Sequence, residues 1–336
     1  MKIIRNIEVP TGNIIIGEVD SGLVEFLSIG DYGKEVNLKC DAMGLTGDID
    51  KVTHGQMLPL TEKWVVTIST QHGCSMGCSF CDVPLVGAGK NVSMVGLIDQ
   101  VKSVLELYPE ITSTKRLNIH YARMGEPTFN NNVLKATEHL LKSFPQHNIH
   151  PVVSTMMPNN NVSLGWFLAE WMWMKNSLME GNAGLQLSIN STNEMERDVM
   201  FGGCALGLSE IAAVMKPIPA PEGRKITLNF AVADYEIDPD VLLKHFSPEH
   251  YIIKLTPMHT TKTAAHNMIK TDGDYTTMTP YSKHEEKLKS AGYDVLVFIA
   301  SKEEDLGRIT CGNAILSGTL PLVDFKELQP IKGANQ

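Results

Sequence analysis

Hydrophobic and polar positions alternate along the first sixty residues with the period of two that strands require. The alternating runs are separated by Gly or Asp turns, and from Gly44 to about Glu62 the sequence is typical of a loop. The pattern predicts a small antiparallel sheet at the N-terminus, built from the runs IIRNIEV, NIIIGEV, LVEFLSI and EVNLKC.

Beyond residue 63, strand-like runs alternate with helix-like ones, which is typical of a parallel sheet with crossover helices. The predicted strands are Trp64 to Ser69, Arg116 to Ala122, Ile149 to Thr155, Leu185 to Asn190, Ile226 to Val232 and Tyr251 to Leu255, with helices near 93–108, 131–144, 164–178, 194–216, 238–246 and 281–291. Six such units predict an α/β fold, a partial (β/α)6 barrel open on one side, which a seventh strand, Asp294 to Ala300, could extend. We divide the chain into a β-rich N-terminal subdomain and loop (1–62), the barrel (63–300) and a C-terminal segment carrying Cys311 (301–336).

Composition narrows the class of protein. The chain has 336 residues, of which 43% are hydrophobic and 20% charged, as in ordinary globular proteins. Neither the N-terminus MKIIRNIEVP nor any other segment has the long apolar run of a signal peptide or membrane span, so we expect a cytoplasmic protein with no membrane partner. The net charge of -9 argues against a surface made for non-specific nucleic-acid binding.

Three of the six cysteines, Cys74, Cys78 and Cys81, lie within eight positions, directly after the first barrel strand. The carboxyl edge of a parallel sheet is where α/β proteins place their chemistry, and Gly73 and Gly77 would let the loop bend sharply. This grouping favours a metal site over a disulfide framework. Three thiolates could hold an iron-sulfur cubane and leave one iron open, or, with His72, could form a closed zinc site.

The CxxxCxxC spacing is the signature of the radical S-adenosylmethionine (SAM) superfamily. From about Trp64 to Leu316 the chain further resembles the RlmN/Cfr family of RNA adenine methyltransferases. Five stretches carry this resemblance through their order and spacing: ISTQHGCSMGCSFC, ARMGEP, VVSTMMP, LSINSTNEMERD and TCGNAIL.

The resemblance implies a partial α/β barrel that cleaves SAM reductively at a 4Fe-4S cluster on the three cysteines and methylates an adenine carbon. It implies that Gly125 and Glu126 meet the SAM amino group. Contacts to the SAM ribose and carboxylate would come from Ser154 and from Ser188, Ile189 and Asn190. His259, expected on the last barrel strand, stands where the family usually has Asn. Each of these residues also has an ordinary alternative, such as a turn, a strand end or a helix cap.

Cys311 in the TCGN stretch matches the cysteine that accepts a methyl group in that family. The family's second cysteine, which resolves the protein–RNA adduct, is replaced here by Thr67, whose hydroxyl cannot form a disulfide. Cys40 or Cys204 could substitute, although a scattered cysteine is more often a small buried apolar residue. We expect a short strand-rich leader in place of the family's N-terminal accessory domain.

The substrate is therefore expected to be an RNA adenine, or else a nucleotide or a peptide. Arg123, Lys262, His266 and Lys270 are candidates for RNA contacts near the mouth of the barrel. The electron would come from a reductant such as flavodoxin or ferredoxin. Two alternatives stay open at this point: a radical SAM enzyme on a non-RNA substrate without a methyl-cysteine carrier, and a non-enzymatic metal-binding or electron-carrier protein with a fully ligated metal.

Overall fold

The computed structural model describes residues 1–31, 57–270 and 279–329. Within them a single large sheet of eleven strands has the order β12-β11-β10-β9-β8-β7-β4-β3-β2-β1-β13, and a two-stranded ribbon, β5-β6, stands apart. The strands are β1 (Lys2–Val9), β2 (Gly12–Val19), β3 (Gly22–Ile29), β4 (Trp64–Ile68), β5 (Gln71–Gly73), β6 (Ala88–Asn91), β7 (Leu117–Tyr121), β8 (Ile149–Thr155), β9 (Gly184–Ser188), β10 (Ile226–Val232), β11 (Tyr251–Pro257), β12 (Val295–Val297) and β13 (Lys326–Leu328).

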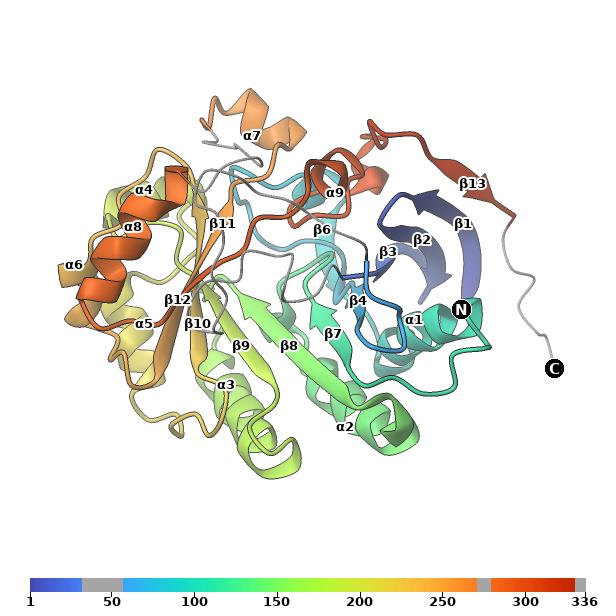
Figure 1. The fold of residues 1–336 in the computed structure, drawn as a ribbon, viewed down its shortest axis with the longest axis horizontal. Coiled ribbons are helices and arrows are strands. Elements are labelled where there is room, and N and C mark those ends of the chain that lie inside the picture. Colours follow the sequence, from blue (N-terminus) through green and yellow to red (C-terminus); the bar gives the residue numbers. More distant parts are fainter. Residues whose placement is uncertain (32–56, 271–278, 330–336) are drawn as a thin grey trace.

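The seven strands from β4 to β12 are parallel neighbours in chain order, as a succession of β/α units requires. The helices between and after them are α1 (Met94–Leu107), α2 (Asn132–Ser143), α3 (Leu164–Trp173), α4 (Glu194–Met200), α5 (Leu208–Met215), α6 (Pro239–Leu243), α7 (Lys262–His266), α8 (Thr279–Ser290) and α9 (Lys302–Leu306). Figure 1 shows the curved sheet with α1, α2, α3 and α8 along its outside, and with α7 and α9 beyond the carboxyl ends of the strands. The predicted α/β fold with a partial barrel is confirmed.

The outward side of each barrel strand is apolar and packs on the helices. Leu185 and Leu187 on β9 and Ile253 and Leu255 on β11 belong to one continuous core with residues of α1, α2 and α3. Because successive strand residues point to opposite faces, the residues between them face the interior of the barrel. This alternation explains why the sequence pattern located all seven strands.

The N-terminal strands continue the barrel sheet. β1, β2 and β3 form an antiparallel meander, and β3 pairs antiparallel with β4. β13 closes the far edge on β1. The first three predicted strands are thus present, while EVNLKC and most of the expected loop before Glu62 lie outside the described residues. The division into 1–62, 63–300 and 301–336 stays a prediction.

One predicted helix is wrong as a single element. The stretch 194–216 forms two helices, because α4 ends at Met200 and the chain then passes through Gly202 and Gly203, whose φ angles are 61° and 70°. Left-handed residues cannot continue a right-handed helix, so α5 begins anew at Leu208. The predicted helix near 164–178 is present as α3 followed by a π-helical turn over Met174–Leu178.

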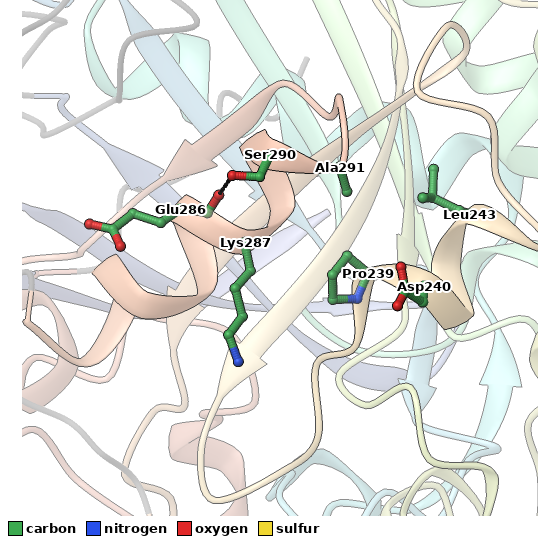
Figure 2. A pocket seen from close by; sticks show the side chains of 7 residues that line it. All are labelled: Pro239, Asp240, Leu243, Glu286, Lys287, Ser290 and Ala291. Atoms are coloured by element: carbon green, nitrogen blue, oxygen red, sulfur yellow. Dashed lines mark hydrogen bonds between the residues drawn. The ribbon is translucent and has the colours of Figure 1, made fainter.

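No helix of the described ranges has the length and apolar character to cross a membrane. A surface hollow between α6 and α8 is lined by Pro239, Asp240, Leu243, Glu286, Lys287, Ser290 and Ala291 (Figure 2). The one contact drawn there is local, from the Ser290 hydroxyl to the Glu286 carbonyl at 2.8 Å. None of the residues predicted for the site lines this hollow.

Candidate active site

The three clustered cysteines lie on a loop held by the ribbon β5-β6. β5 follows β4 and pairs antiparallel with β6, and the Cys74 N–H donates to the Gly87 carbonyl at 3.0 Å. Gly73 has a φ of 77°, and a Cβ there would meet the Gly87 carbonyl oxygen at 2.2 Å. Its glycine is therefore required, whereas Gly77 has no left-handed φ and faces open space.

The three thiols are half-buried, free of disulfides and close enough to perturb one another electrostatically. Burial raises the pKa of Cys74 to about 11 and raises the pKa of Cys78 and Cys81 as well, in each case mainly through desolvation. A metal centre would reverse this preference, because its positive charge stabilises the thiolates it binds. Three soft thiol ligands on one loop fit an iron-sulfur cluster.

The zinc alternative finds no support in the described residues. Among them no group of three or more His, Cys, Asp or Glu is arranged to hold a single metal ion. His72, the fourth ligand in that alternative, has its Nδ1 3.1 Å from the Leu23 carbonyl, and its ring lies against Gly22. The thiolates of a cubane bind different irons, so they need not converge on one point as zinc ligands must.

The Gly125–Glu126 turn lies beside the cysteine loop, as its motif predicts. Gly125 has a φ of 94°, and a Cβ would lie 2.6 Å from the Gln71 side chain. The Glu126 carboxylate is buried and accepts from the Met156 N–H at 3.1 Å and from the Thr128 hydroxyl at 2.8 Å. Desolvation raises its pKa, and its charge acts on Cys74 and Cys78.

Met156 joins this turn to the cysteine loop. Its Sδ lies 3.8 Å from the Cys78 Sγ, while its N–H bonds the Glu126 carboxylate. Met156 belongs to a cluster of buried apolar side chains around the loop, together with Met76, Met200, Phe201, Ala233 and Met258. This apolar lining limits access of water to the sulfurs.

The predicted residues at the ends of β8 and β9 have different orientations. Ser154 on β8 and Ser188 on β9 face the barrel interior, whereas Ile189 is fully buried in the core beneath the helices. Asn190 has a φ of 62°, and its Oδ1 accepts from the Ala231 N–H at 3.0 Å. Its amide therefore ties the end of β9 to β10.

His259 lies two residues beyond the end of β11, not on the strand as expected. Its Nδ1 is 3.3 Å from the Asp305 carboxylate, so α9 holds this imidazole. Strand β11 ends at Pro257, which has no N–H with which to continue a ladder.

Cys311 lies next to the cysteine loop although it is remote in sequence. The Asp82 N–H donates to the Gly312 carbonyl at 2.8 Å, and a Cβ on Gly312 would lie 3.8 Å from the Cys81 Cα. The Cys311 side chain is exposed to solvent. Surrounding protein raises the pKa of its thiol, while the charges of Lys254 and Arg123 act in the opposite direction.

The prediction that Arg123 contacts RNA at the barrel mouth is wrong. Arg123 is buried and pairs with the buried Glu25, to which its Nε donates at 2.9 Å. Its guanidinium also donates to the Arg308 carbonyl at 2.8 Å. The other three mouth candidates, Lys262, His266 and Lys270, are exposed on or just after α7.

Sequence reasoning missed three residues that shape this site. Glu25 binds Arg123 and also accepts from the N–H groups of Ile315 and Leu316, at 3.3 and 3.1 Å. Arg197 donates to the carbonyls of Ser188, Ile189 and Leu206. Asp82 accepts from the Thr263 N–H at 2.8 Å and so ties the start of α7 to the cysteine loop. Only Asp82 had a local signal, as the residue that follows Cys81.

Several known proteins are similar to part of this chain. No family model matches the chain. An RlmN dual-specificity RNA methyltransferase of Anaeromyxobacter dehalogenans is 27% identical over 187 residues, 54% of this chain and 48% of that protein. One from Helicobacter hepaticus is 35% identical over 94 residues, 28% of this chain and 25% of that protein.

The solved structure of a radical SAM methyltransferase from Sphaerobacter thermophilus matches with a TM-score of 0.64 at 17% identity, over 93% of this chain and 80% of that one. The chain is thus similar to RlmN methyltransferases over about half of its length, and its fold is similar to that of a radical SAM methyltransferase. The matched region spans about half the length of the curated RlmN relatives. At 17% identity this solved neighbour bears on the fold of the chain alone.

Proposed function

We propose that this RlmN-like chain is a radical SAM methyltransferase. Its 4Fe-4S cluster would be held by Cys74, Cys78 and Cys81, and a methyl group would be carried on Cys311. The cluster, when bound, supplies the electron and the open iron site at which SAM is cleaved reductively. The observation that carries the proposal is the 2.8 Å hydrogen bond from Asp82 N–H to the Gly312 carbonyl, because it joins the acceptor segment to the cysteine loop.

The residues around the loop have properties suited to holding SAM. Glu126 offers a buried carboxylate to an ammonium group, and the Gly125 conformation lets the backbone approach closely. We assign Ser154, Ser188, Asn190 and His259 to the remaining polar contacts of SAM. Ile189 would contribute through its backbone, since its side chain is buried in the core.

Cys311 must lose its proton to accept a methyl group, because the thiolate is the nucleophile. Lys254 and Arg123 place positive charge near its sulfur and act to lower its raised pKa. Lys254 lies on β11 and Arg123 just after β7, so the barrel positions both charges.

Thr67 gives weight to a second candidate function. It faces the barrel interior on β4, paired in register with His120 and with Leu27 of β3. Threonine cannot resolve an adduct through a disulfide. Cys204 lies beyond α4, with its thiol 3.3 Å from the Gly202 carbonyl, and Cys40 lies outside the described residues. The second candidate is a radical SAM enzyme that acts on a nucleotide or peptide without a methyl-cysteine carrier.

One experiment tests both candidates. The protein is reconstituted anaerobically with iron and sulfide and incubated with methyl-labelled SAM and dithionite, which replaces a flavodoxin or ferredoxin. We expect 5′-deoxyadenosine and one labelled methyl group on the peptide that contains Cys311. Cys311→Ala should lose the label and keep SAM cleavage, while the control Cys204→Ala should keep both.

The outcomes separate the candidates. Label that is absent from the wild-type protein while 5′-deoxyadenosine still forms would favour the second candidate. Zinc in the purified protein, or no SAM cleavage at all, would overturn both.

A further inference from the structure

The interior face of the barrel carries many polar residues, together with a few apolar ones such as Val152 and Ile252. The residues that alternate with the apolar core positions are in register across neighbouring strands, so their side chains share one face. The polar ones among them are Asn118 and His120 on β7, His150 and Ser154 on β8, Gln186 and Ser188 on β9, Thr227 and Asn229 on β10, and Lys254 on β11. Such a lining favours a polar ligand rather than a packed apolar core.

Two basic side chains, Lys254 and Arg224, lie against β9 at this face. The Lys254 Nζ lies 3.5 Å from the Gln186 Oε1 and 5.2 Å from the centre of the Phe298 ring. The Arg224 guanidinium turns in over β9, where its Nη1 lies 3.0 Å from the place a Cβ on Gly184 would occupy. A side chain larger than glycine at that position would displace the guanidinium.

Burial and neighbouring cations lower the pKa values of the basic groups at this face. The pKa of Lys254 is lowered to about 8, first by burial and then by Arg224. The pKa of His120 is lowered to about 3 by burial and by four cations, which are Lys254, Arg224, Lys63 and Arg116. Lys63 has a carboxylate partner, Asp31, at 2.5 Å, whereas among the described residues it is the Cys311 thiol that acts to raise the pKa of Lys254.

This concentration of positive charge runs against the composition of the chain, whose net charge is -9. Lys254 is half-buried, so its charge costs free energy unless a counter-ion or a ligand neutralises it, whereas Arg224 is exposed. The Lys254 charge lies close enough to Cys311 to lower the pKa of its thiol. A ligand that neutralises Lys254 would therefore lie near Cys311.

We propose that the barrel interior binds a phosphomonoester group of the substrate through Lys254 and Arg224, below Cys311. The proposal rests on the proposed function and narrows its substrate class to a mononucleotide-like molecule. A dianion matches two or more converging cations, and a guanidinium can bind two phosphate oxygens at once. A terminal phosphate can enter the interior end-on, whereas an internal RNA phosphodiester is flanked by nucleotides on both sides.

Binding measurements on the anaerobically reconstituted full chain test this proposal. The probes are adenosine 5′-monophosphate, adenosine, and a short adenosine-containing oligoribonucleotide without terminal phosphates, compared by calorimetry. We expect the monophosphate to bind at least ~10-fold more tightly than adenosine, because its phosphate gains charge-assisted hydrogen bonds that adenosine cannot make. Lys254→Met and Arg224→Gln should each remove most of this preference. The control Lys142→Met, on the exposed side of α2, should retain it.

Each outcome has one meaning. Equal affinity for monophosphate and adenosine, or a preference that survives both interior substitutions, overturns the proposal. Tighter binding of the oligoribonucleotide with the same dependence on Lys254 overturns the mononucleotide class. A monophosphate preference that depends on Lys254 in a protein that forms no 5′-deoxyadenosine would support the anion site and overturn the proposed function.

Discussion

The buried ion pair between Glu25 and Arg123 is predicted to anchor the segment that carries Cys311. The side chains are 0% and 2% exposed, respectively. Glu25 also accepts from the backbone of Ile315 and Leu316, and Arg123 donates to the carbonyls of Arg308 and Thr310. The pair therefore connects β3, the end of β7 and the C-terminal segment.

Glu25→Gln removes the charge and keeps the shape, which leaves the Arg123 cation buried without its counter-ion. Removing one partner of a buried pair costs about 3–5 kcal/mol. For a chain of 336 residues the entropy of unfolding is about 0.7 kcal/mol per degree, so a loss of about 3 kcal/mol lowers the melting temperature by about 4 °C. Replacing both residues, as Glu25→Leu with Arg123→Met, should restore part of the loss because no charge stays buried.

The assay is thermal unfolding of the wild-type protein and the variants, followed by amide hydrogen exchange. The matched control is Glu138→Gln, which breaks an exposed pair with Lys142 on α2 and should cost less than ~1 kcal/mol. Exchange should accelerate selectively over residues 308–316 in Glu25→Gln. A melting temperature no lower than that of the control, or unchanged exchange in this segment, would refute the anchoring role.

Two further predictions concern the interior and the turn beside the cysteines. Since the pKa of His120 is lowered to about 3 in the folded state from an ordinary 6.5, the unfolded chain binds a proton first as the pH falls. As the pH falls from 7 to 5, protonation of His120 in the unfolded chain therefore lowers the free energy of unfolding by about 2 kcal/mol. His120→Gln should lower the measured pH dependence of urea unfolding by that amount, and identical slopes would contradict it. Gly125→Ala should cost about 1–3 kcal/mol through its left-handed φ and its contact with Gln71, and it should weaken SAM binding. Gly77→Ala, with open space around it, is the control, and equal melting temperatures for the two variants would count against the steric argument.

Much of the candidate site was accessible to sequence reasoning because its residues follow strands directly. Cys74 and Glu126 each come shortly after a barrel strand, and parallel strands bring their carboxyl ends to one edge. The proximity of these motifs could therefore be predicted from their order alone. The same logic located Ser154 and Asn190, but not the buried orientation of Ile189.

The roles of Arg123 and Glu25 could not be obtained in this way. A lone arginine after a strand has the same local signature whether it faces solvent or a buried carboxylate. Glu25 lies in an alternating strand pattern that gives no sign of a partner near residue 123. Only the antiparallel pairing of β3 with β4 brings this carboxylate under the end of β7.

The sequence by itself determined the partial barrel, its strand order and the loop that carries three cysteines, because these depend on local periodicity and on the short connections of β/α units. Tertiary structure alone decided that Cys311 lies beside that loop, that Arg123 is buried, and that Arg224 lies close enough to Lys254 to lower its pKa. These features arise when sheet curvature brings distant residues into one confined space. The free energy of burying and pairing charges there depends on neighbours that no stretch of sequence specifies.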